Sequence, residues 1–143
     1  MLTIEDITEW IKQHGEDGGE VTLVHDDAGG IVMFNMWFDN EINKVVGVDM
    51  KAAGYYTLTV FELLLFTYDE ASNTHVLKNV LDAAGRAELV PFILDDPGHG
   101  GWSAMMIKTI RPSTIEEFET DLKEFSVSVL VAHRRLHKED KDE

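Results

Sequence analysis

The strongest constraint on the fold is an apolar repeat near the C-terminus of the chain. Between residues 112 and 136, apolar side chains recur at spacings that alternate between three and four, at Ile115, Phe118, Leu122, Phe125, Val129, Ala132 and Leu136. This periodicity predicts one long helix with a continuous apolar stripe. Either Ser113 with Glu116 or Thr114 with Glu117 can form the capping box that begins it. Such a helix must cover a sheet in its own domain or pack against a second copy of itself.

The same helix carries more apolar surface than one neighbour needs. Val127, Leu130 and Val131 lie outside the narrow stripe. Because a helix that faces a single neighbour buries a single stripe, we expect this additional side to pack against a second copy. We therefore predict a homodimer whose interface includes Val127, Leu130, Val131 and Arg134.

The rest of the chain alternates between helix and strand signals. A first helix is expected from a Thr3 cap, with Asp6 three residues later, to a stop at Gly15, and a short middle helix from Asn73 or Thr74 to Gly85. Six segments have strand character, at residues 20–25, 31–38, 44–50, 55–68, 89–95 and 102–110. The run Leu63–Phe66 is apolar at consecutive positions and fits a buried strand or a helix start equally well. Pro91 restricts its strand to an edge, a bulge or a strand start.

These elements predict an α+β fold. We expect an antiparallel sheet of five or six strands, packed by an N-terminal helix, a short middle helix and a long C-terminal helix. The chain of 143 residues has no linker-like stretch. Residues 1–137 should therefore form a single domain, and the mixed-charge residues 138–143 a frayed tail.

Composition limits the partners of the chain. Twenty-seven acidic and 12 basic residues give a net charge of −15, and the first 50 residues contain 11 of the acidic residues and two of the basic ones. An acidic surface repels phosphate backbones, so we expect no nucleic-acid binding, whereas a basic polypeptide would be attracted. No apolar run is long enough to span a membrane, no signal peptide is evident and cysteine is absent. We expect a cytoplasmic protein without thiol chemistry.

Catalytic signatures are missing from the sequence. It contains no nucleophile elbow, phosphate-binding loop, dinucleotide fingerprint or zinc-protease motif, so we assign no catalytic residue and no cofactor, and expect no enzyme. Two turns contain both imidazole and carboxylate groups, and the candidate ligands of a divalent ion are His25, Asp27, Asp96 and His99. Asp and Gly also favour turns for backbone reasons, which explains both turns without a metal.

The order of elements from residue 68 to residue 136 resembles that of the YbjN and type III secretion chaperone-like family. The resemblance lies in the short helix, the strand Val90–Asp95, the Gly-rich turn and the helix start Ser113–Phe118. In its first half the chain has four strand-like segments where the family has three. The resemblance implies a non-enzymatic, chaperone-like or regulatory domain that binds a polypeptide partner and dimerises. Two alternatives remain: an acidic immunity or inhibitor protein that neutralises a basic toxin, and a metal-dependent hydrolase.

Overall fold

The computed structural model describes residues 2–15, 21–27, 30–52, 54–71 and 74–137. The prediction of a frayed tail at residues 138–143, and the middle of the first hairpin turn, lie outside these residues. The elements, in chain order, are α1 (Ile4–Gly15), β1 (Val21–Asp27), β2 (Ile31–Phe38), β3 (Ile42–Ala52), β4 (Tyr55–Thr67), α2 (Tyr68–Ala71), α3 (Thr74–Ala87), β5 (Val90–Asp96), the single 3-10 turn η1 (Pro97–His99), β6 (Gly101–Ile110) and α4 (Ile115–Leu136).

The sheet has six strands in the order β1-β2-β3-β4-β6-β5, and every neighbouring pair is antiparallel. The α+β prediction is confirmed, and the ambiguous run Leu63–Phe66 is strand, within β4. Pro91 lies in β5, an outer strand of the sheet, where its missing N–H need not break an inner ladder.

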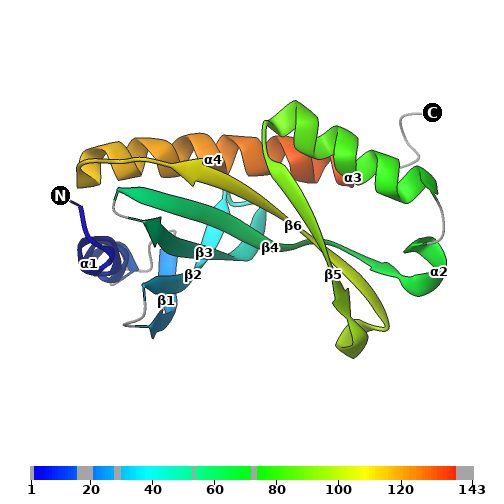
Figure 1. Cartoon of the computed structure of the whole chain (residues 1–143), viewed down its shortest axis with the longest axis horizontal. Helices are drawn as coiled ribbons and strands as arrows, with labels where there is room; N and C mark the ends of the chain where they lie inside the picture. Colours follow the sequence, from blue (N-terminus) through cyan, green and yellow to red (C-terminus); the bar gives the residue numbers. More distant parts are fainter. Residues whose placement is uncertain (1, 16–20, 28–29, 53, 72–73, 138–143) are drawn as a thin grey trace.

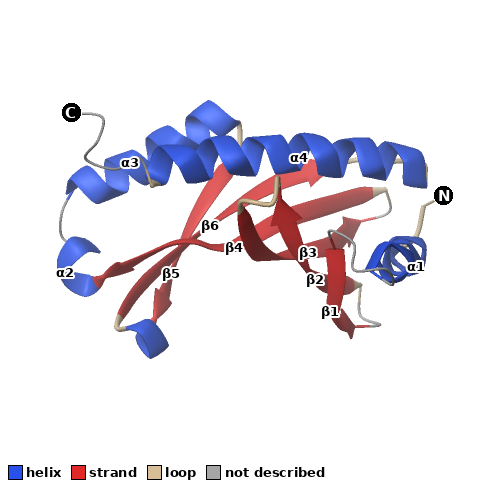
Figure 2. Ribbon diagram, turned by 180° about the vertical axis from the view of Figure 1, so that it is seen from behind, coloured by secondary structure: helices blue, strands red, loops and turns tan. Residues whose placement is uncertain are grey.

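The helices pack on one face of this sheet. In Figures 1 and 2, α4 and α3 lie together along one side of the strands and α1 lies at one end, near β1 and β2. Strand β2 shows the resulting alternation, because Val32, Phe34 and Met36 are buried towards the helices while Met33 and Asn35 point the other way. The described helices leave that second face uncovered. None of them is long and apolar enough to cross a membrane.

Two helix starts have the predicted capping geometry. The backbone N–H of Thr3 donates to Asp6 Oδ2 at 3.0 Å, and the N–H of Asp6 donates to Thr3 Oγ1 at 3.1 Å. In α4 the cap is Thr114, whose hydroxyl accepts from the N–H of Glu117 at 3.2 Å. The Thr114 alternative is therefore the one that forms.

The predicted end of the middle helix at Gly85 is wrong by two residues. Helix α3 continues to Ala87 and ends with Glu88 in the left-handed region, at a φ of 58°. The N–H of Leu89 donates to the carbonyl of Ala84 at 2.9 Å and that of Glu88 to the carbonyl of Gly85 at 3.2 Å, which is a Schellman motif. The sequence suggested Gly85 because glycine favours this conformation, but here a glutamate adopts it.

Candidate functional site

The uncovered face of the sheet is hollowed along its length. One hollow of about 580 Å³ crosses strands β2 to β6 and is lined mainly by apolar groups, among them Met33, Phe61, Phe92 and Met105. A second hollow of about 460 Å³ shares Met33 and Phe61 with the first and continues past Leu94. We call the two together the open-face groove. An apolar groove of this size on an uncovered sheet is typical of a binding surface.

Phe61, which lines both hollows, lies close to Gly47 on the floor of the groove. A Cβ atom at Gly47 would lie 3.1 Å from Cε2 of the Phe61 ring, which is closer than ordinary van der Waals contact. Because Gly47 has no side chain, the Phe61 ring can lie across β3. Strand β3 therefore contributes backbone rather than side chain at this point.

Strand β5 forms one wall of the groove and one edge of the sheet. Val90, Phe92 and Leu94 alternate along it, and each is about half exposed. The outer side of β5 pairs with no strand among the described residues, so part of its backbone hydrogen-bonding capacity is open. Natural proteins rarely leave an apolar edge strand uncovered, because it pairs readily with other chains.

The groove ends in acidic groups. Asp95 and Asp96, at the end of β5, line the second hollow together with Glu62 of β4. The hydroxyl of Tyr68 donates to Asp95 Oδ1 at 2.6 Å, and the ring of Tyr68 packs edge-on against Trp102 at 5.8 Å between centroids. The hydrogen bond to Asp95, followed by desolvation and the charges of Asp95 and Asp96, raises the pKa of Tyr68. The hydroxyl therefore stays protonated and fixes the Asp95 carboxylate.

Glu62 belongs to this acidic end because of a bulge in β4. Between Val60 and Leu64 the strand contains two residues more than the facing stretch of β6, from Met106 to Ala104. Glu62 has a φ of 51°, and its carbonyl oxygen accepts a hydrogen bond from Lys44 Nζ at 2.7 Å. Bulges of this kind redirect a side chain out of the regular alternation. Sequence reasoning did not single out Glu62, although a lone charge within the run Val60–Leu65 was a signal.

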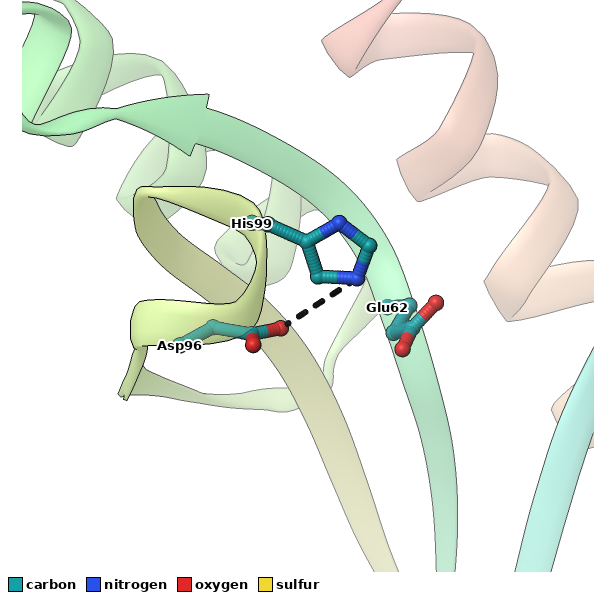
Figure 3. Close-up of side chains that lie close together, drawn as sticks. All are labelled: Glu62, Asp96 and His99. Atoms are coloured by element: carbon teal, nitrogen blue, oxygen red, sulfur yellow. Dashed lines mark ion pairs between the residues drawn. The ribbon is translucent and has the colours of Figure 1, made fainter.

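Glu62, Asp96 and His99 gather at one point (Figure 3). One donor atom from each lies within 4.8 Å of the others, and His99 Nε2 is 3.7 Å from Asp96 Oδ2. Residues 97–99 form the 3-10 turn that brings the imidazole back over Asp96, with Gly100 in the left-handed region at a φ of 69°. Imidazole and carboxylate groups in this arrangement can bind a divalent ion.

The four candidate ligands named from the sequence, His25, Asp27, Asp96 and His99, do not lie together, because their two turns are far apart on the sheet. The first turn lies where β4 begins, because Ile31 pairs with Asp49 and Asp49 pairs with Thr57. The second turn lies where β4 ends, because Gly101 pairs with Thr67. Most of β4 therefore separates the two turns, and this strand of 13 residues is roughly 40 Å long when extended. The turns also lie at opposite edges of the sheet. The side chains of His25 and Asp27 lie outside the described part of β1.

The residues of the predicted dimer interface are only partly on the surface. Val127 is 62% exposed and Val131 is 41% exposed, one turn apart on α4. The assignment of Leu130 to the dimer interface is wrong, because this side chain is only 8% exposed and belongs to the core of its own domain. Arg134 binds Glu41 through Nη2 at 2.8 Å, and this hydrogen bond is the main cause of the lowered pKa of Glu41. Arg134 therefore fastens α4 to the turn before β3.

No family model, curated protein or solved structure matches the chain. Fold and groove together define an α+β domain with one sheet face covered by helices and the other open.

Proposed function

We propose that this protein is a non-enzymatic, cytoplasmic interaction module that binds an extended polypeptide segment along the open-face groove. The observation that carries the proposal is the apolar edge strand β5, which borders the groove and ends at Asp95 and Asp96. The occupant is a segment in which apolar residues alternate with basic ones.

The geometry supports this occupant by two independent contributions. An added strand can pair with the open backbone edge of β5, which supplies affinity that depends little on sequence. Alternate side chains of that strand then lie on the open face beside Val90, Phe92 and Leu94 of β5, which border the groove. The apolar contacts select apolar residues at every second position.

The acidic end of the groove selects for charge. Among the described residues, no lysine or arginine forms an ion pair with Glu62, Asp95 or Asp96. A lysine or arginine of the partner would meet these carboxylates, and the net charge of −15 would raise its association rate. The same order of elements that resembles the secretion chaperone-like family supports a polypeptide rather than a small-molecule ligand.

A short basic peptide tests this proposal. We expect the labelled peptide (Lys-Val)4 to bind the wild-type protein in a fluorescence-anisotropy titration, and (Glu-Val)4 to bind at least tenfold more weakly. Phe92→Ala should weaken binding of (Lys-Val)4 by about tenfold, because it removes an aromatic side chain from the groove wall. Raising the NaCl concentration from 50 to 300 mM should weaken binding further.

Val127→Ala is the matched control, because Val127 is also exposed and apolar but lies on α4, away from the groove. It should change the dissociation constant by less than about twofold. Equal binding of the two peptides would contradict the claim that the acidic end of the groove selects basic residues. Equal loss of affinity in Phe92→Ala and Val127→Ala would place the peptide elsewhere.

The proposal includes a homodimer formed through α4. Val127 borders an apolar hollow of about 450 Å³ that also contains Trp10, Met36 and Leu122. A twofold axis beside α4 would cover Val127 and Val131 of both copies at once, as isologous interfaces do. This face lies opposite the groove, so dimerisation would leave both grooves accessible.

Light scattering coupled to gel filtration tests the dimer. We expect a mass near twice 16.1 kDa for the wild type and one near 16.1 kDa for the double variant Val127→Glu, Val131→Glu. Two carboxylates per chain, four in the dimer, buried without partners would cost more than an interface of a few apolar contacts supplies. A monomeric wild type would contradict the dimer. A dimer that persists in the double variant but dissociates in Phe92→Ala would move the interface to β5.

A further inference from the structure

The donor cluster at the end of the groove has the composition of a metal site rather than of an acidic surface. It combines one imidazole with two carboxylates, from β4, the end of β5 and η1. We propose that Glu62, Asp96 and His99 bind a divalent transition-metal ion, with Zn²⁺ as the ion of highest affinity among those tested below. This proposal does not depend on the peptide-binding function.

The local charge favours a cation. Glu62, Asp95 and Asp96 place three carboxylates around one end of the groove. The ammonium group of Lys44, which lines the same hollow, donates to the backbone carbonyl of Glu62. Within the described part of the chain, the only ion pair that Glu62 or Asp96 forms is the 3.7 Å contact of Asp96 with His99. A bound cation would therefore neutralise charge that the chain leaves uncompensated.

The spacing of the donors fits an ion after a small closure. Zinc holds nitrogen and oxygen ligands at about 2.0 to 2.2 Å, which puts neighbouring donors about 3.4 Å apart in a tetrahedron. The 3.7 Å contact between His99 and Asp96 is already near that value, and the outer limit of the cluster is 4.8 Å. Glu62 and His99 are exposed, so their side chains can rotate inwards without disturbing the core. Three protein ligands would leave at least one coordination position for water.

The donor types decide which ion is preferred. Neutral imidazole suits Zn²⁺, Cu²⁺ and Ni²⁺, whereas Mg²⁺ and Ca²⁺ prefer all-oxygen sites. Coordination would join the β4 bulge to the turn between β5 and β6. These two segments form the acidic end of the groove, so the ion would fix its shape.

Calorimetric titration with ZnCl₂ alone, at pH 7.5 and without an affinity tag, tests the site. We expect one Zn²⁺ per chain, at least tenfold weaker affinity in His99→Ala, Asp96→Asn and Glu62→Gln, and no saturable binding of MgCl₂ in the same range. His75→Ala is the matched control, because it removes an exposed histidine of α3, and should bind like the wild type.

A second measurement separates coordination from general attraction to acid. Zn²⁺ should raise the thermal unfolding temperature of the wild type and of His75→Ala, but not that of His99→Ala, while all three unfold cooperatively without metal. Several weak sites, equal binding of Zn²⁺ and Mg²⁺, or unchanged affinity in His99→Ala would each overturn the proposal. Peptide binding measured with EDTA should persist, so failure of one proposal is distinguishable from failure of the other.

Discussion

Gly101→Ala is expected to lower the free energy of unfolding by about 3 kcal/mol, because the added methyl group would meet backbone rather than a movable side chain. Gly101 begins β6, between Thr67 of β4 and Asp96 of β5. A Cβ atom there would collide with the carbonyl oxygen of Phe66 and lie 2.8 Å from Cα of Thr67. Relief requires β4 and β6 to separate where they pair. We expect the unfolding temperature to fall by about 10 °C, measured by circular dichroism.

Gly85→Ala is the matched control and should act in the opposite direction. Gly85 lies in helix α3 and does not have a positive φ, and a Cβ atom there would have no heavy atom within 4 Å beyond its own helix backbone and chain neighbours. Alanine there should stabilise the protein by about 1 kcal/mol, as expected for glycine in a helix interior. If Gly101→Ala were as harmless as Gly85→Ala, β4 and β6 could not pair at Thr67 as described.

Phe118→Ala is expected to lower the free energy of unfolding by about 4 kcal/mol. The ring of Phe118 is fully buried and meets the Trp10 ring edge-on, at 5.6 Å between centroids. The Phe118 ring joins α4 to α1. The variant should therefore weaken both the packing of the core and the contact between α1 and α4. Urea denaturation measures the stability, and hydrogen exchange should show less protection in residues 4–15 than in β4.

Phe92→Ala makes the same chemical change at a half-exposed position on the open face. It should cost about 2 kcal/mol, because only about half of the Phe92 side chain leaves water on folding. A similar cost for the two variants would contradict the assignment of Phe118 to the core and of Phe92 to the surface. The same measurement will establish whether Phe92→Ala is folded under the conditions of the peptide titration.

The sequence predicted the elements of this fold better than the site. Local signals placed the first cap at Thr3, limited the cap of the last helix to Ser113 or Thr114, and restricted Pro91 to an edge, a bulge or a strand start. Capping and proline effects depend on a few neighbouring residues, and the structure selects Thr114 and the edge. The Glu62 bulge could not be predicted, since it depends on how β4 pairs with β6. The short helix α2 at Tyr68–Ala71 was missed for a similar reason, as four residues carry no periodicity.

The candidate metal ligands also show that local patterns do not reveal which strands pair. Asp96 and His99 are three residues apart, and the turn between them brings them together. The choice of their partner depended on strand order and register, which no local pattern contains. His25 and Asp27 were chosen because they resemble the second turn in composition, whereas the structure brings in Glu62 from the middle of a neighbouring strand.

The exposed edge of β5 also makes the protein prone to associate with copies of itself. Two copies could pair through these edges and continue into fibrils, since Val90, Phe92 and Leu94 form a ready template. Mutual repulsion of molecules that each carry a net charge of −15 opposes this. The repulsion vanishes as the pH approaches the isoelectric point of about 4.6. The surplus of acidic residues therefore opposes self-association through the exposed edge of β5 at neutral pH.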